Sequence, residues 1–300
     1  MPDFYSRTNP GYRGHSGSGG LSAPGAPRAL PDQADGLRRL FAGKRRRVVL
    51  PLAANPHGAG SPRVLDRLAA TLAQQGRHVL VVDAASTSPL PHELATVDLQ
   101  ACVLNVAPRV SYLAARGLPM EFVDTRGSAA HFVQAVMEAA PQADVVLLHA
   151  DGIELARLLK DSAVRPMLLA ADHPESIKHA YANAKLLARR CGLMTYDLLL
   201  VAAAQSPRLT GIADSLSSCL ETFLGAVLRG TALIDPNGAA DARASAALSR
   251  VLAAQLALDE VAPLPSYVQQ PQTGGAASPQ LYPDAAVMAQ ARTASRPAFR

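Results

Sequence analysis

The chain has 300 residues, of which 49% are hydrophobic, enough for one large domain or two small ones with a buried core. Its formal net charge of +5 is modest, so the charge does not indicate a nucleic-acid partner and we expect none. The three cysteines have no paired spacing, which argues against a disulfide framework and a structural zinc site. No apolar stretch has the length of a membrane span or the pattern of a signal peptide, so we expect a cytoplasmic protein.

The composition divides the chain into five predicted parts. These parts are disordered residues 1–30, a short amphipathic helix at 31–43, an α/β domain at 44–237, a C-terminal helix at 238–261 and a disordered tail at 262–300. The basic run Lys44–Arg47 lies between the short helix and the domain. It is either a solvated flank of the first strand or a contact to an anionic membrane or protein surface.

The stretch from Val48 to Asp83 carries the clearest structural signal. An apolar strand at 48–52 leads into a loop with Gly and Pro, and an amphipathic helix follows the loop. A second apolar strand at 78–83 ends in an acid. Together they form a βαβ unit of the parallel-sheet type, whose first loop is the usual place for a phosphate.

Strands and helices continue to alternate beyond this unit. Further strands are predicted at 101–106, 121–124, 144–150, 166–171 and 197–203, with a short edge strand at 231–234, and further helices at 112–116, 128–139, 177–190, 212–229 and 239–260. This alternation predicts a single doubly wound α/β domain with a mostly parallel sheet.

The loop after the first strand has the position of a phosphate-binding loop without its residues. A Walker A loop needs glycines around the phosphates, then a Lys, then a Ser or Thr that binds Mg²⁺. When Gly58 and Gly60 are aligned on that pattern, Ser61 stands in place of the Lys and Pro62 in place of the hydroxyl residue. Ser61 removes a positive charge, and Pro62 has neither a hydroxyl nor an N–H. The loop either only turns the chain or is the remnant of a nucleotide site.

The ends of the other strands differ from a nucleotide hydrolase in the same way. In such an enzyme a Mg²⁺-linked Asp would end the strand at 144–150, but here that residue is His149. Asp151 lies two residues further on, and Asp83 ends the strand at 78–83. We predict neither a metal site nor a catalytic residue from these positions.

The order of these elements resembles the MinD/ParA family of P-loop ATPases. The loop at 55–62, the strand end His149–Gly152 and the stretch Asp172–Ala182, which contains His-Pro-Glu and His-Ala-Tyr-Ala, carry this resemblance. The stretch Asp32–Leu40 is similar to the Asp-Gln-Ala motif of one branch, the flagellar-number regulators FlhG and FleN. The resemblance covers about residues 31–260 and implies the P-loop NTPase fold of MinD and ParA.

In that branch the motif is implied to bind and stimulate FlhF, a GTPase of the signal-recognition type that sets where flagella are built. The resemblance therefore implies a partner-binding helix at 31–43, with recruitment to the cell pole or the inner membrane surface as a further implication. Its contact residues would be Asp32, Gln33, Ala34, Leu37 and Arg38. The simpler alternative is that this helix packs on its own domain.

Several departures from the family pattern concern the ligands of the nucleotide. Pro56 stands where the family has its signature Lys, Ala85 replaces one acid of an Asp-x-Asp pair, and the adenine-binding amide expected near Ala202 is missing. Each lost charge-assisted hydrogen bond costs about 1.5–3 kcal/mol. We therefore expect no bound cofactor, unless the degenerate site still binds Mg²⁺-ATP.

The sequence thus predicts a MinD-like regulator of flagellar number or placement that acts by binding protein and not as an enzyme. The remnants of its cofactor site would be Gly58, Gly60 and Asp83. Two alternatives stay open. The first is an ATPase with a remodelled site, and the second is a pseudo-ATPase subunit that forms a homodimer or pairs with an active MinD-like paralogue. The remodelled site would use His57, Arg63, Asp83 and Asp151.

Overall fold

The computed structural model describes residues 47–58, 61–203, 206, 208–239 and 243–261. Within these ranges eight strands form one sheet in the order β3-β4-β2-β5-β1-β6-β7-β8, and every neighbouring pair is parallel except β3 with β4. The strands are β1 Val48–Ala53, β2 Val79–Asp83, β3 Leu104–Ala107, β4 Val110–Ala114, β5 Val145–Ala150, β6 Met167–Ala171, β7 Thr195–Val201 and β8 Val227–Ile234.

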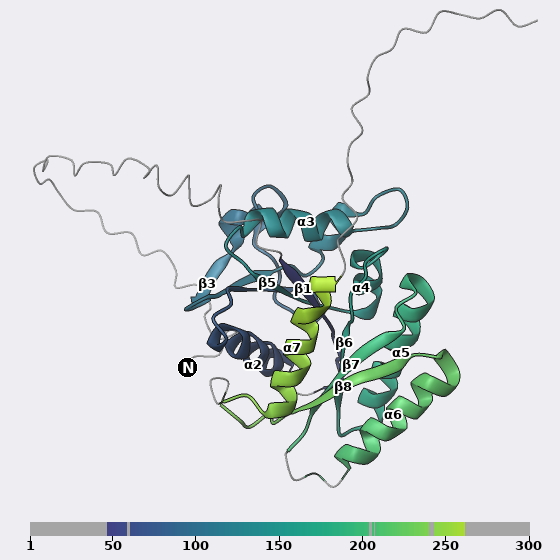
Figure 1. Ribbon diagram of the computed structural model, residues 1–300. Coiled ribbons are helices and arrows are strands. Elements are labelled where there is room, and N and C mark those ends of the chain that lie inside the picture. Colours follow the sequence, from purple (N-terminus) through teal and green to yellow (C-terminus); the bar gives the residue numbers. More distant parts are fainter. Residues whose placement is uncertain (1–46, 59–60, 204–205, 207, 240–242, 262–300) are drawn as a thin grey trace, which may run out of the picture. The chain divides into compact units, whose positions relative to one another are not determined.

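Helices cover both faces of this sheet (Figure 1). Helices α2 and α7 share one apolar cluster with one face, and α3, α4, α5 and α6 share a second cluster with the other face. Their bounds are α2 Ser61–Gln74, α3 Ala130–Ala139, α4 Gly152–Leu158, α5 Pro174–Cys191, α6 Leu209–Leu224 and α7 Ala246–Val261, and three short 3₁₀ helices are η1 Glu93–Thr96, η2 Gln100–Cys102 and η3 Leu118–Phe122. The predicted doubly wound, mostly parallel α/β sheet is confirmed.

The central strands are mostly apolar, as expected for strands that are covered on both faces. In β1, Leu50 and Leu52 pack in the cluster of α2, whereas Ala53 packs in the cluster of the opposite face. All six residues of β5 are buried, including His149. The carboxyl ends of β2, β5, β1 and β6 therefore lie side by side at one edge of the sheet.

Several predicted elements differ from the structure. The helix predicted at 112–116 is wrong, because residues 112–114 form the end of strand β4, which pairs with β2 and β3. The strand predicted at 121–124 is also wrong, because its first residues lie in η3, which starts after Gly117 with φ of 81° and has Pro119 in its first turn. Helix α6 ends at Leu224 and not at 229, since Gly225 adopts φ of 63° and β8 begins at Val227.

The predicted partner helix at 31–43, with Asp32, Gln33, Ala34, Leu37 and Arg38, lies outside the described residues, as do Gly60 and both termini. Of the basic run, Arg47 is described, and its guanidinium donates to the carbonyls of Met137 at 2.5 Å and Pro141 at 3.1 Å. This cation therefore anchors the start of β1 to the end of α3. Among the helices of the described ranges, none combines the length and apolar character needed to cross a bilayer.

Candidate functional site

The candidate site lies at the carboxyl edge of the sheet, where the loops after β1, β2, β5 and β6 meet. In an open α/β sheet this edge is the usual place of a ligand site. The register of the parallel strands sets Asp83 of β2 beside His149 of β5, and His149 beside Leu52 of β1. Two polar residues thus lie beside each other at the carboxyl ends of two neighbouring central strands.

Asp83 and His149 form a buried pair. His149 Nδ1 lies 2.7 Å from Asp83 Oδ1, and the two side chains are 2% and 1% exposed. This contact involves Nδ1 of the imidazole and leaves Nε2 as the second ring position. Nε2 is buried, and no hydrogen-bond partner faces it within the described part of the chain.

Two hydroxyl groups also contact the Asp83 carboxylate. The Ser88 hydroxyl donates to Oδ1, the oxygen that also faces His149, and the Tyr112 hydroxyl donates to Oδ2 at 3.2 Å. Ser88 is itself buried, and Tyr112 comes from the neighbouring strand β4. Both carboxylate oxygens are therefore engaged by side chains of the protein, which stabilises the buried charge.

The loop after β1 is held by a buried amide. Asn55 Nδ2 donates to the carbonyls of Leu169 at 2.7 Å and Ser176 at 2.8 Å, while Asn55 Oδ1 accepts from the His57 amide at 3.1 Å. The Gly58 amide donates to the Asn55 carbonyl at 3.0 Å. The loop is thus tied to β6 and to the start of α5 by its own chain.

A second polar group lies around His179 of α5. The rings of His57 and His179 meet edge to face, with centroids 5.8 Å apart. Burial first, and the neighbouring His57 second, lower the pKa of His179, while Asp151 and the Ala54 carbonyl oppose this. Asp151 Oδ2 also accepts from the Ser86 amide at 2.8 Å, so the carboxylate positions the loop after β2.

These contacts separate the residues of the predicted remodelled ATPase site. His57 and Asp151 both act on His179, whereas Asp83 is engaged with His149. The Arg63 guanidinium donates to the carbonyl of Pro236, in the connection between β8 and α7. The sequence predicted Asp83 and Asp151 as candidate site residues and treated His149 only as the replacement of an acid. It did not point to Asn55, Ser88 or Tyr112. The signal available for Asn55 was an Asn two residues after a buried strand.

No family model and no curated protein matches the chain. Among solved structures, a plasmid partition protein from Borrelia burgdorferi matches 70% of this chain and 99% of its own, at 11% identity and a TM-score of 0.49. McdA from Cyanthece matches 71% of this chain and 96% of its own, at 13% identity and a TM-score of 0.46. A chain of the MinC:MinD cell division complex from Aquifex aeolicus matches 61% and 80%, at 14% identity and a TM-score of 0.44.

The acid that ends β2 at the carboxyl edge already has protein partners. Magnesium requires oxygen ligands that are free to enter an octahedral shell, and both oxygens of Asp83 already accept from His149, Ser88 and Tyr112. His149 stands at the strand end where such a site would place a second carboxylate. Within the described ranges, no group of three or more His, Cys, Asp or Glu side chains is arranged to hold a metal ion.

Proposed function

We propose that this protein acts by binding another protein and not by hydrolysing ATP. The observation that carries the proposal is the buried contact of 2.7 Å between Asp83 and His149. In a P-loop hydrolase the acids at these strand ends bind the magnesium ion of the nucleotide, directly or through water. Here the remaining acid, Asp83, contacts His149, Ser88 and Tyr112. In this proposal it stabilises the sheet and does not bind a ligand.

The loop after β1 also lacks the positive charges that would bind the phosphates of a nucleotide. Residues 56–62 contain no Lys or Arg, and the next cation, Arg63, donates to the Pro236 carbonyl. A nucleotide triphosphate would have to displace this contact and the internal partners of Asp83. Since each charge-assisted hydrogen bond contributes about 1.5–3 kcal/mol, the loss of several disfavours useful ATP affinity.

The finer proposal concerns the partner. It rests on the resemblance of Asp32–Leu40 to the Asp-Gln-Ala motif of the flagellar-number regulators, a stretch that lies outside the described residues. The partner would be a GTPase of the FlhF type, and the function would be the control of flagellar number or placement. A domain that keeps its fold but not its nucleotide ligands would then serve as a scaffold for this helix.

The test of the first step is calorimetry with ATP and ADP in the presence of Mg²⁺. We expect no saturable heat at the carboxyl edge and no thermal stabilisation of the protein. A His149→Asp variant, which restores an acid at the strand end, should not regain binding because the loop still lacks its Lys. Micromolar ATP binding that is lost when Arg63 is changed to Gln would contradict the proposal and favour the remodelled ATPase.

The test of the partner uses the full chain and a purified FlhF-type GTPase. The double variant Gln33→Ala, Leu37→Ala should weaken binding and stimulation at least about 10-fold, as expected for the loss of central contacts of a helix. The control is Arg28→Ala, Leu30→Ala, which removes a polar and an apolar side chain just before the predicted helix. Equal stimulation by all three proteins would remove the flagellar part of the proposal and leave the first part untouched.

A further inference from the structure

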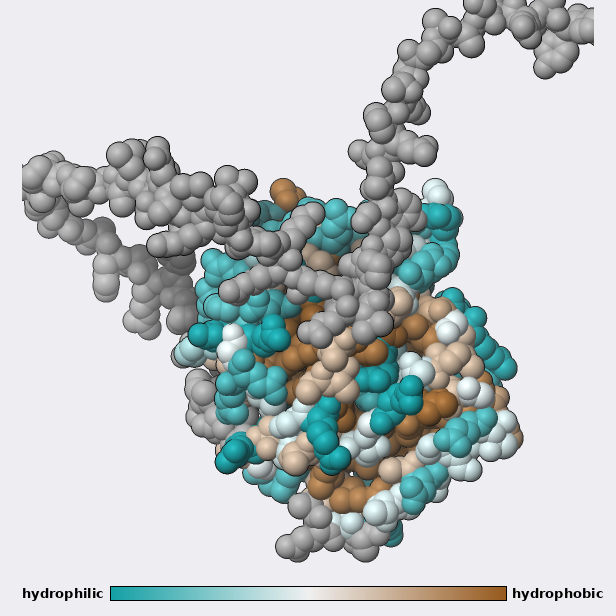
Figure 2. All heavy atoms as spheres, viewed as in Figure 1, coloured by the Kyte–Doolittle hydropathy of each residue, from teal (hydrophilic) through white to brown (hydrophobic). Residues whose placement is uncertain are grey.

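A pocket of about 530 Å³ lies between helix α7 and the edge strand β8, on the sheet face that α2 and α7 cover. Its lining includes three arginines, Arg165, Arg229 and Arg250, and one acid, Asp197. Asp197 lies near the start of β7, so the pocket is displaced toward the amino ends of the strands and away from the carboxyl edge. Figure 2 shows this side of the molecule, with hydrophilic residues standing among hydrophobic ones.

A buried charge network forms the floor of this pocket. Arg165 Nε lies 2.9 Å from Asp197 Oδ2, with the side chains 10% and 1% exposed. Gln255 of α7 donates to the same Asp197 oxygen at 2.7 Å and to the Arg165 carbonyl at 2.8 Å. Asp197 is thus well supplied with donors, but the guanidinium is not supplied with acceptors. Arg165 Nη2 is buried and faces no hydrogen-bond acceptor within the described ranges.

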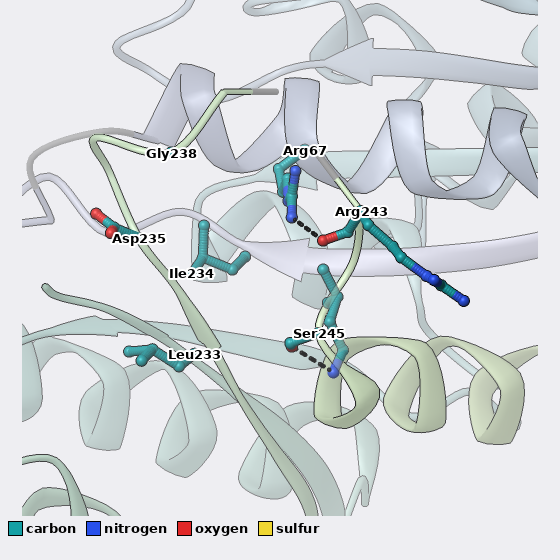
Figure 3. A pocket seen from close by; sticks show the side chains of 8 residues that line it. Arg67, Leu233, Ile234, Asp235, Gly238, Arg243 and Ser245 are labelled. Carbon is teal, nitrogen blue, oxygen red and sulfur yellow. Dashed lines mark hydrogen bonds between the residues drawn. The ribbon is translucent and has the colours of Figure 1, made fainter. Parts of the chain in front are cut away.

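A second, smaller pocket contains an arginine whose guanidinium donates hydrogen bonds to acceptors of the chain. It has a volume of about 230 Å³ and is lined by Arg67 of α2 and by the connection from β8 to α7 (Figure 3). The Arg67 guanidinium donates to the carbonyls of Ala239 and Arg243, each at 2.8 Å. Arg67 therefore fastens a loop, and its donors are used by the chain. In the Arg165 guanidinium, by contrast, a buried N–H donor has no acceptor within the described ranges, and an unmet buried donor costs free energy.

Strand β8 has an irregular backbone where it lines the same pocket. The pairing of β7 with β8 shifts so that Tyr196 faces Leu228 while Asp197 faces Gly230, which leaves Arg229 as the extra residue of a β-bulge. A bulge changes the direction of a side chain, and Arg229 is part of the pocket lining. A Cβ at Gly230 would lie 2.9 Å from Val251 Cγ2 and 3.0 Å from Asp197 Oδ1, so only glycine fits here without a shift.

We propose that this pocket binds the phosphoryl group of a small molecule. Three arginines and one aspartate give it a net charge of +2, from three positive charges and one negative charge. This complements a phosphate monoester, whose charge near pH 7 is about −1.5 to −2. Guanidinium groups bind phosphate oxygens through paired N–H donors, and Arg229 and Arg250 come from the two sides of the pocket, β8 and α7.

The size of the pocket and its remaining walls define the class of ligand further. A volume of about 530 Å³ exceeds the need of a bare phosphate and falls within the range of small-molecule sites. Thr231 adds a hydroxyl, and Ala247 and Ala254 of α7 add small apolar walls. Among the described residues that line the pocket, none has an aromatic side chain on which a base would stack. A phosphate ester with a small, polar or aliphatic body therefore fits better than a nucleotide.

The test is calorimetry of the full chain with inorganic phosphate, pyrophosphate and glycerol 3-phosphate, at constant ionic strength set with chloride. Saturable binding is expected, with glycerol 3-phosphate tighter than inorganic phosphate if the pocket accepts an ester. The variants Arg229→Gln and Arg250→Gln should each weaken binding about 10-fold through the loss of a charge-assisted contact. Both side chains are exposed, so both variants should keep the unfolding midpoint of the wild type.

The control is Arg77→Gln, which removes one exposed positive charge outside the pocket lining and should leave binding unchanged. The proposal is overturned if none of the three compounds binds saturably, or if Arg77→Gln weakens binding as much as Arg229→Gln. Tighter binding of inorganic phosphate than of the ester would assign the pocket to the free anion. Any ATP heat that disappears in Arg229→Gln belongs to this pocket and leaves the proposal for the carboxyl edge intact.

Discussion

The carboxyl edge of the sheet and the pocket beside α7 each contain a buried carboxylate, but the two are used in opposite ways. Asp83 accepts from His149, Ser88 and Tyr112, and its site is filled by the protein itself. Asp197 lies in an open pocket with three arginines, where positive charge exceeds negative charge. The difference is one of surroundings: hydroxyl and imidazole groups engage the carboxylate of Asp83, whereas arginines surround the carboxylate of Asp197.

The largest effect is predicted for a variant that removes His149 from its buried pair with Asp83. The variant His149→Ala should lower the free energy of unfolding by about 3 kcal/mol, because it leaves a cavity and removes the partner of a buried carboxylate. Urea unfolding at pH 7 measures this loss. The control His131→Ala removes an exposed imidazole from α3 and should change stability by less than about 0.5 kcal/mol. Equal values for the two variants would show that the pair contributes nothing to the fold.

The second prediction compares backbone positions at the two sites. A Cβ at Gly152, after β5, would lie 2.4 Å from the Oδ1 of Asn183, whose amide holds the Ala54 carbonyl. Gly152→Ala and Gly230→Ala should therefore each cost about 1–3 kcal/mol of stability. Gly230→Ala should also weaken phosphate binding, since it disturbs the pocket, whereas Gly152→Ala should not.

The matched control for these glycines is Gly211 in α6, where an added Cβ meets nothing within 4 Å. Gly211→Ala should stabilise the protein by about 0.5–1 kcal/mol, because alanine is the better helix former. Thermal unfolding of the three variants gives the order directly. A loss of stability in Gly211→Ala as large as in Gly152→Ala would contradict the argument from close contacts.

The smallest predicted effect is a pH dependence at the open site. Burial raises the pKa of Asp197 above its ordinary value of 3.8, against the opposing effect of Arg165. The folded state therefore keeps the proton to a higher pH than the unfolded state, so this contribution to stability is present below pH 3.8 and is lost as the pH rises through the raised pKa. The stability of the wild type relative to Asp197→Asn should fall with rising pH in urea unfolding between pH 4 and 7. If the stability of the wild type relative to Asp197→Asn rose with pH, the pKa of Asp197 would be lowered in the folded protein and the prediction would be wrong.

The central strands of the sheet could be predicted from the sequence, whereas strand β4 and the end of helix α6 could not. Strands β1, β5 and β6 are apolar runs buried on both faces, and such runs are visible without a structure. Strand β4 was predicted as a helix because Val110–Ala114 is only partly buried, so the sequence shows no clear strand pattern there. The strand is defined by its pairing with β2 and β3. The end of α6 was missed because Gly225 was not recognised as its cap.

The sequence by itself determined the alternation of strands and helices and the absence of a Walker lysine, since Ser61 and Pro62 can be identified from the chain alone. The tertiary structure decided what the remaining polar residues do. Asp83 and His149 are 66 residues apart, and they meet only because β2 and β5 are neighbours in one register. The arginine pocket likewise joins residues before β6, in β8 and on α7. Local patterns record propensity and burial, whereas contacts between distant residues depend on strand order, register and helix packing.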